Sequence, residues 1–152
     1  MGAELALVTD ALVRATPLMI AGLAVALAFR GGVFNIGAEG QLLVGAAAAT
    51  TVSLAGHAFF GRGVVVIALA AAAVAGGCWA AIAAELRRRF RVLEIISTIM
   101  LNFIAIYLVS FLVRGPLQEP THIYPQTESL PAAARLPILV PGSRLHLGFA
   151  LG

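Results

Sequence analysis

Four long apolar stretches constrain what this chain can fold into more than any other feature. They lie near residues 15–29, 33–54, 64–84 and 93–113, and the only charged residues inside them are Glu39 and Glu94. A helix of about twenty apolar residues crosses a hydrocarbon core of about 30 Å, and in lipid the backbone must satisfy its own hydrogen bonds. We therefore expect an all-α, polytopic transmembrane helix bundle of about four spans plus the start of a fifth near residue 147.

Composition supports an integral membrane protein rather than a soluble one. Of 152 residues, 61% are hydrophobic and only 11% are charged, well outside the range of ordinary water-soluble domains. The net charge of +3 does not indicate a nucleic-acid partner, because four of the arginines gather beside an apolar stretch, at Arg87, Arg88, Arg89 and Arg91. Such a cluster predicts a cytosolic loop in a multi-pass protein of the bacterial cytoplasmic membrane, surrounded by the lipid bilayer.

The order of the spans then determines on which side of the membrane each remaining segment is expected. With the arginine cluster in the cytosol, alternation places residues 114–146, which are rich in proline and polar residues, in an external loop. It also places the N-terminus outside, which suggests that an upstream span is missing. The apolar run from residue 147 stops after a few residues, so we expect residues 1–152 to be part of one transmembrane domain.

Three polar residues stand near the start of the second stretch: Asn35, Glu39 and Gln41. If a helix begins at Val33, Asn35 and Glu39 share a face, and Glu39 lies about 9 Å beyond the helix start. A carboxylate at that depth costs at least about 2.5 kcal/mol, so we expect Glu39 to face the bundle interior or a water-filled path and to have a partner. Gln41 would point nearly the opposite way.

The fourth stretch carries a second polar stripe. Glu94, Thr98 and Asn102 follow one another at intervals of four, which brings Asn102 near the middle of the bilayer. A carboxamide both donates and accepts, as recognition of uncharged, hydroxylated solutes such as sugars and nucleosides requires. Glu94 is better explained as an acid favoured at a helix N-terminus. Two interpretations stay open for the other polar residues, a substrate pathway or a clamp between helices; the residues are Asn35, Glu39, Gln41, Thr98 and Asn102.

Glycines accompany the polar residues in both regions. Gly37, Gly40 and Gly45 either permit tight helix packing or belong to a broken, partly re-entrant backbone. Gly76 and Gly77 of the third stretch alternate with alanines at intervals of four, a pattern that lets neighbouring backbones approach closely. We therefore expect all five glycines to serve helix packing, with the broken backbone left open as the alternative for the first three.

The chain lacks the motifs of catalysis and metal binding. Its three histidines have no metal-ligand spacing, and its single cysteine, Cys78, excludes a cysteine-based metal site. No phosphate-binding loop, nucleophile motif or paired catalytic carboxylates are present. We therefore expect a non-catalytic protein that itself binds neither a cofactor nor a metal.

Three stretches resemble a known family, the membrane permease subunits of bacterial ABC importers for nucleosides and simple sugars. They are "ATPLMIAGLAVALAFRGGVFNIGAEGQLLVGA", "FRVLEIISTIMLNFIAIYLVSFLVRGPL" and "SRLHLG", and the core Phe34 to Gln41 of the first is the most specific. The resemblance implies a helix bundle that pairs with a second permease subunit, the same or different. It also implies two cytosolic ABC ATPase subunits that bind ATP and Mg, and an extracytoplasmic lipoprotein that delivers the small-molecule solute.

The chain also departs from the pattern of that family. Its members are longer, begin with a further helix, and carry in their later half an Ala-rich cytosolic loop that docks on the ATPase. The sequence "ELRRRFR" is basic but does not contain that docking motif. The alternative is therefore a truncated or non-transporting membrane assembly or scaffold protein.

Overall fold

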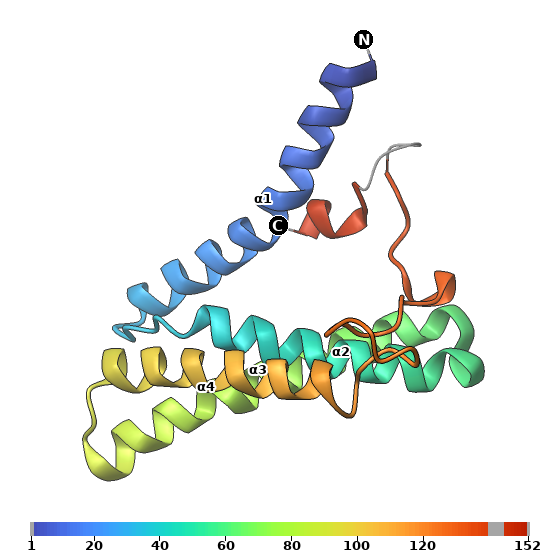
Figure 1. The fold of residues 1–152 in the computed structure, drawn as a ribbon. Coiled ribbons are helices and arrows are strands. Elements are labelled where there is room, and N and C mark those ends of the chain that lie inside the picture. Colours follow the sequence, from blue (N-terminus) through green and yellow to red (C-terminus); the bar gives the residue numbers. More distant parts are fainter. Residues whose placement is uncertain (1, 140–144, 152) are drawn as a thin grey trace. The chain divides into compact units, whose positions relative to one another are not determined.

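The computed structural model describes residues 2–139 and 145–151 and is built from helices (Figure 1). Within those ranges the only β-type pairing is an isolated bridge between Ile138 and His146. This confirms the all-α class. The long helices are α1 (Gly2–Arg30), α2 (Ala38–Phe60), α3 (Val64–Phe90) and α4 (Glu94–Arg114), and the short 3-10 helices are η1 (Gly61–Gly63), η2 (Ala132–Ala134) and η3 (Leu147–Leu151).

By length and composition, three continuous helical stretches are able to cross a membrane: Glu4–Arg30, Ala38–Phe90 and Glu94–Arg114. The second stretch contains both α2 and α3, because η1 joins them without a non-helical gap. The chain reverses its direction at η1. Gly61 has φ 51° and ψ −129°, a conformation open to glycine and strained for other residues. The apolar stretches predicted from the sequence thus become four long helices joined by short connections.

The first helix is longer than the apolar stretch at residues 15–29 that predicted it. It begins at Gly2, because the polar side chains before residue 15 find partners within the helix. The Thr9 hydroxyl donates to the carbonyl of Leu5 at 2.9 Å, and Arg14 pairs with Asp10 four residues earlier. Hydropathy alone does not reveal such hydrogen bonds and ion pairs within a helix.

The third helix also extends past its apolar stretch, to Phe90 instead of residue 84. Its last turns are stabilised by ion pairs from Glu85 to Arg88 and Arg89, at 2.7 Å each. Arginines near a helix C-terminus are favoured by the helix dipole. The helix ends where Arg91 takes a left-handed conformation, with φ 54° and ψ 27°.

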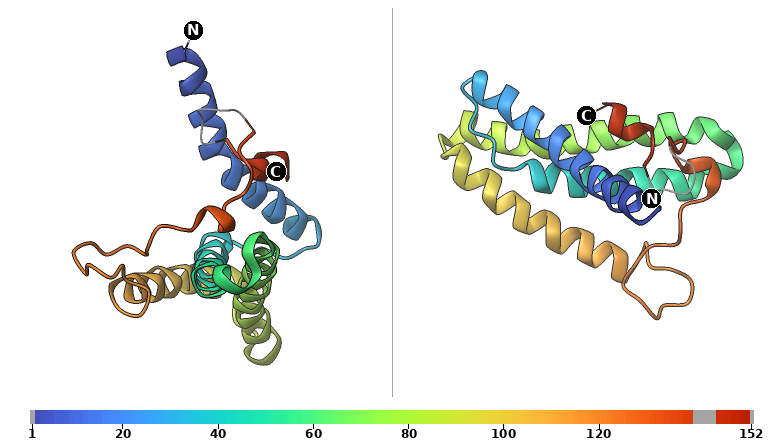
Figure 2. Two further views of the ribbon diagram at one scale, coloured as in Figure 1. Left: turned by 90° about the vertical axis from the view of Figure 1, so that its right-hand side faces the viewer. Right: turned by 90° about the horizontal axis from the view of Figure 1, so that it is seen from above.

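The described chain divides into two compact units, and residues 33–135 form the larger one. There α2 packs against both α3 and α4, and Figure 2 shows α3 and α4 on different sides of α2. The interior is small: Val64, Ala68, Leu101 and Ala105 are buried, while most large apolar side chains are exposed. Such an outward apolar surface is typical of helices that face lipid or other transmembrane helices.

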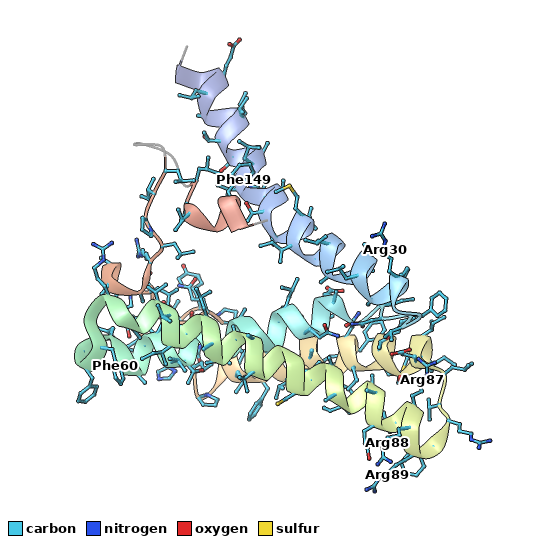
Figure 3. The ribbon with its side chains drawn as sticks, turned by 180° about the vertical axis from the view of Figure 1, so that it is seen from behind. Arg30, Phe60, Arg87, Arg88, Arg89 and Phe149 are labelled. Atoms are coloured by element: carbon cyan, nitrogen blue, oxygen red, sulfur yellow. The ribbon has the colours of Figure 1, made fainter. Side chains whose placement is uncertain are left out.

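The smaller unit consists of α1 and the segment from Leu136 onward. The 3-10 helix η3 packs on α1, and Figure 3 shows Phe149 beside that helix. The Leu139 N–H donates to the Leu145 carbonyl at 2.8 Å. At the predicted start of a fifth span the structure has only the short η3. Residues 140–144 of the predicted external loop lie outside the described residues.

Candidate functional site

The chain is not helical where the sequence analysis placed the start of the second span. Residues 33–37 are irregular, and α2 begins at Ala38, so the predicted start at Val33 is wrong. The Asn35 side chain explains the difference, because its Oδ1 accepts the N–H of Gly37 at 2.7 Å in an Asx-type turn. Gln41 reaches back to the same oxygen at 3.3 Å. Asn35 therefore precedes the helix and does not share a helical face with Glu39.

Two polar residues of α4 hold this irregular segment in place. The Ile36 N–H donates to the Thr98 hydroxyl at 3.4 Å, and the Asn102 Nδ2 donates to the Ile36 carbonyl at 3.0 Å. The Asn102 Oδ1 accepts the N–H of Gly40, in the first turn of α2, at 2.9 Å. Non-helical backbone at membrane depth needs such partners, since lipid supplies none. We call residues 33–37 with Thr98 and Asn102 the polar break.

Thr98 is nearly inaccessible, with an exposed fraction of 3%. Its hydroxyl donates to the carbonyl of Glu94 at 2.8 Å while it accepts from Ile36, so both of its hydrogen-bonding roles are used. Asn102 likewise uses its oxygen and its nitrogen. The structure therefore brings Asn35, Gln41, Thr98 and Asn102 together around one short piece of backbone.

Glu39 does not take part in these contacts. It is the second residue of α2, its side chain is exposed, and no hydrogen bond or ion pair links it to another described residue. Because α2 starts later than expected, Glu39 lies in the first helical turn instead of two turns inside. An acid is favoured there by the helix dipole. The expected partner of Glu39 is not found among the described residues.

Trp79 is a residue that sequence reasoning did not place at this site. Its indole Nε1 is buried and has no hydrogen-bond partner in the described structure. A Cβ built on Gly40 would lie 3.2 Å from that nitrogen, so the indole packs directly on the α2 backbone beside Asn102. The signal was in the sequence: Ala72, Gly76 and Trp79 follow one another on one face of α3.

Glycines allow the close approach of α2 and α3. A Cβ on Gly45 would stand 3.0 Å from the carbonyl oxygen of Ala72, and one on Gly76 would stand 3.1 Å from that of Gln41. Gly77 is different, because a Cβ there would meet no atom within 4 Å. The two neighbouring glycines of α3 therefore have different surroundings, although the same spacing of small residues predicts packing for both.

The arginine cluster lies where α3 ends and α4 begins, and Figure 3 labels three of its members. Arg87 pairs with Glu94 across the corner at 2.5 Å, and the Glu94 side chain is only 11% exposed. Arg91 makes the C-cap of α3, with its N–H donating to the carbonyl of Arg87. The cytosolic position of the arginine cluster stays a prediction.

Among residues 2–139 and 145–151, no three His, Cys, Asp or Glu side chains are placed to hold a metal ion.

Comparison with known proteins identifies a family and three relatives. Residues 7–138 match the family described as "Branched-chain amino acid transport system / permease component". The chain is 47% identical to the glucose ABC transporter permease protein TsgB13 of Haloferax volcanii over 137 residues. These aligned residues make up 88% of this chain and 36% of that protein. It is 43% identical over 150 residues to the guanosine ABC transporter permease protein NupP of Bacillus subtilis. That alignment covers 95% of this chain and 42% of NupP.

A third relative is more distant. The putative glucose ABC transporter permease protein TsgC13 of Haloferax volcanii is 32% identical over 128 residues. The chain spans 36% to 42% of the length of these three proteins. No solved structure matches the chain.

Proposed function

The chain belongs to the branched-chain amino acid transport permease family, and on that premise we propose that it serves as the membrane permease subunit of an ABC importer for nucleosides or simple sugars. Membership of this family and the membrane-spanning helices identify it as an integral, multi-pass protein of the cytoplasmic membrane. Its relatives are named for glucose and guanosine, both of which are uncharged and rich in hydroxyl groups.

The chemistry of the polar break supports the same class of solute. Its polar side chains are two carboxamides and one hydroxyl, which carry no charge and bond to the backbone around the break. An ion pathway through the bilayer would require more fixed charge. In the proposed role, the polar break lies beside the solute route, and Glu39, which has no partner among the described residues, faces that route or a neighbouring subunit.

The proposal includes partners that supply energy and substrate. ATP with Mg would bind to separate ABC ATPase subunits, a second permease subunit would complete the bundle, and an extracytoplasmic lipoprotein would deliver the solute. ATP binding and hydrolysis would switch the bundle between outward-open and inward-open states, which requires the nucleotide to favour one state over the other. This chain would contribute helices and the polar break and would not itself catalyse a reaction.

Uptake of labelled guanosine and glucose by cells that carry the intact complex tests the proposal. We expect Asn102→Ala and Glu39→Ala to reduce uptake at least tenfold, a change that corresponds to about 1.4 kcal/mol. Thr51→Ala is the matched control, because the Thr51 hydroxyl bonds only to the carbonyl of Ala47 in its own helix. Normal uptake in both site variants would refute the role of the site.

The alternative function is a non-transporting assembly or scaffold protein, in which the same hydrogen bonds only hold helices together. A mild-detergent pull-down from native membranes separates the two. Co-purification of an ATPase, a binding lipoprotein and a second permease supports the importer. Recovery of the chain without an ATPase, together with unchanged uptake in cells that lack it, favours the scaffold.

A further inference from the structure

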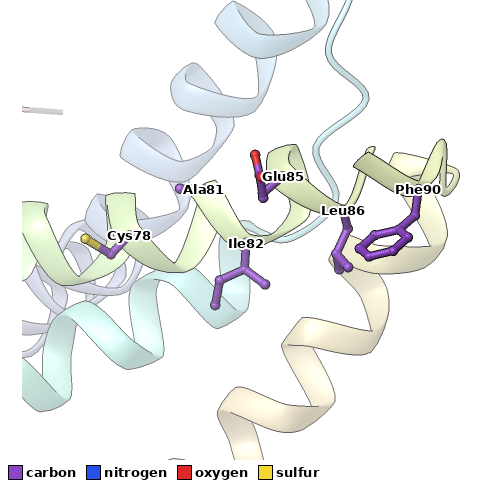
Figure 4. A pocket seen from close by; sticks show the side chains of 6 residues that line it. All are labelled: Cys78, Ala81, Ile82, Glu85, Leu86 and Phe90. Carbon is purple, nitrogen blue, oxygen red and sulfur yellow. The ribbon is translucent and has the colours of Figure 1, made fainter. Parts of the chain in front are cut away.

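A shallow cavity of about 380 Å³ lies along the C-terminal half of α3, and none of its lining residues belongs to the polar break (Figure 4). Its lining is apolar except for one carboxylate, and consists of Cys78, Ala81, Ile82, Glu85, Leu86 and Phe90. Cys78, Ile82, Leu86 and Phe90 follow one another at intervals of four, so they form a stripe that winds slowly around the helix. We call this surface the α3 groove.

The length of the α3 groove matches one leaflet of a bilayer. Cys78 and Phe90 are twelve residues apart, which in a helix is about 18 Å. Half of a hydrocarbon core of about 30 Å is about 15 Å. A lipid acyl chain lying along this stripe would therefore reach from the Phe90 end, near the interface, to Cys78.

The end of the α3 groove at Phe90 is positively charged. Between residues 85 and 94 there are four arginines and two glutamates, which leaves an excess of two positive charges. One of the glutamates, Glu94, is largely covered, so a group approaching from the membrane surface would meet mainly guanidinium groups. Basic clusters at the ends of membrane-spanning helices attract anionic lipid headgroups.

The arginines also retain hydrogen-bond donors. Arg88 uses Nε and Nη2 for Glu85, and Arg89 uses its Nε for the same carboxylate. Their side chains are 68% and 65% exposed, so the remaining N–H groups face outward. A planar guanidinium with free donors suits the oxygens of a phosphate.

From these observations we propose that the α3 groove binds an anionic phospholipid, with the acyl chain along Cys78, Ile82, Leu86 and Phe90 and the phosphate at Arg88 and Arg89. Apolar lining, matching length and charge at one end distinguish this surface from a general lipid-facing helix. The inference does not depend on the proposed transport function.

The single cysteine, Cys78, provides the measurement, because it lines the groove and is exposed. The full chain, labelled at Cys78 with a small fluorophore, is reconstituted in phosphatidylcholine vesicles, and the label is quenched by brominated phosphatidylglycerol or by brominated phosphatidylcholine. We expect phosphatidylglycerol to bind at least about fivefold more tightly, since one arginine near an anionic headgroup contributes about that factor.

The double variant Arg88→Gln/Arg89→Gln should lose this preference, while Arg62→Gln keeps it. Arg62 is the matched control, because it lies in η1 at the opposite end of α3. Equal quenching by the two lipids in the unmodified chain would overturn the proposal, as would a preference that survives the double variant. Absence of quenching by both lipids would also overturn it, because protein would then cover the groove.

Discussion

The side-chain oxygen of Asn102 accepts the backbone N–H of Gly40 at 2.9 Å, although 62 residues separate the two in sequence. This contact ties the first turn of α2 to the middle of α4. It also explains the glycine, because a Cβ at position 40 would lie 2.8 Å from the same oxygen. The irregular segment before α2 can therefore exist in an apolar protein because a second helix completes its hydrogen bonds.

Replacing Asn102 with leucine should destabilise the unit formed by residues 33–135. The substitution leaves the Gly40 N–H and the Ile36 carbonyl without their partner, so we expect a loss of about 1–2 kcal/mol in the free energy of unfolding. Thermal unfolding in detergent, followed by circular dichroism, measures it. Thr51→Ala should stay within about 0.5 kcal/mol. Equal effects of the two changes would contradict the assignment.

Adjacent glycines of α3 should respond to alanine in opposite ways. Gly76→Ala places a Cβ 3.1 Å from the backbone oxygen of Gln41, which cannot move aside easily, and we expect a loss of about 1 kcal/mol. Gly77→Ala meets open space and should gain about 0.5–1 kcal/mol from the better helix propensity of alanine. The melting temperatures of the two variants, measured in the same detergent, test these opposite effects. A gain in both variants would mean that α2 and α3 are less closely packed.

Arg91→Gly should stabilise the corner between α3 and α4. Arg91 has φ 54°, which costs a residue with a Cβ about 1 kcal/mol relative to glycine. Glycine at a helix C-cap relieves that strain, so the melting temperature should rise by a few degrees. Arg91→Ala serves as the control, since it removes the charge and keeps the strain. A rise with alanine as large as with glycine would show that charge, not backbone strain, limits this corner.

The loop after α4 should loosen in acid. Side-chain hydrogen bonds from Gln126 and Thr121 hold the pKa of the Glu119 carboxyl below its ordinary value, with help from the backbone N–H of Tyr124. A carboxyl whose pKa is lowered by folding stabilises the folded loop above its ordinary pKa, and this stabilisation is lost as pH falls through the lowered value.

Hydrogen exchange of the Tyr124 amide, corrected for the intrinsic rate, should therefore be faster at about pH 3 than at about pH 6. Glu119→Gln should remove most of this pH dependence. Glu128→Gln is the control, because Glu128 lies in the same loop outside the hydrogen-bond network of Glu119. The same pH dependence in both variants would assign the effect to another group.

The helices themselves could be predicted from hydropathy, since each apolar stretch became a long helix. Their ends could not, because polar residues near Gly2 and Glu85 find partners within their own helix and extend it beyond the apolar region. The acid at Glu94 was correctly placed at a helix N-terminus, where the structure begins α4. Hydropathy therefore predicts that a helix is present better than it predicts the residue at which the helix ends.

At the candidate site, too, the residues could be selected from the sequence but the start of the helix could not. Sequence reasoning selected Asn35, Thr98 and Asn102, but it put Asn35 inside a helix whose start is set by the Asx-type turn of that residue. The turn is visible only when its partner Gly37 and the bonds from α4 are known. The choice between a broken backbone and tight packing depended on contacts between residues more than sixty positions apart.

The reversal at Gly61 has a consequence for biogenesis. Only the three residues of η1 separate α2 from α3, and Arg62 is the only charged residue among them. A ribosome would deliver these two helices to the translocation machinery almost without a polar interval. Because a short connection exposes few peptide groups and carries one charge, the pair can enter the lipid together as a hairpin, without prior passage of a hydrophilic domain.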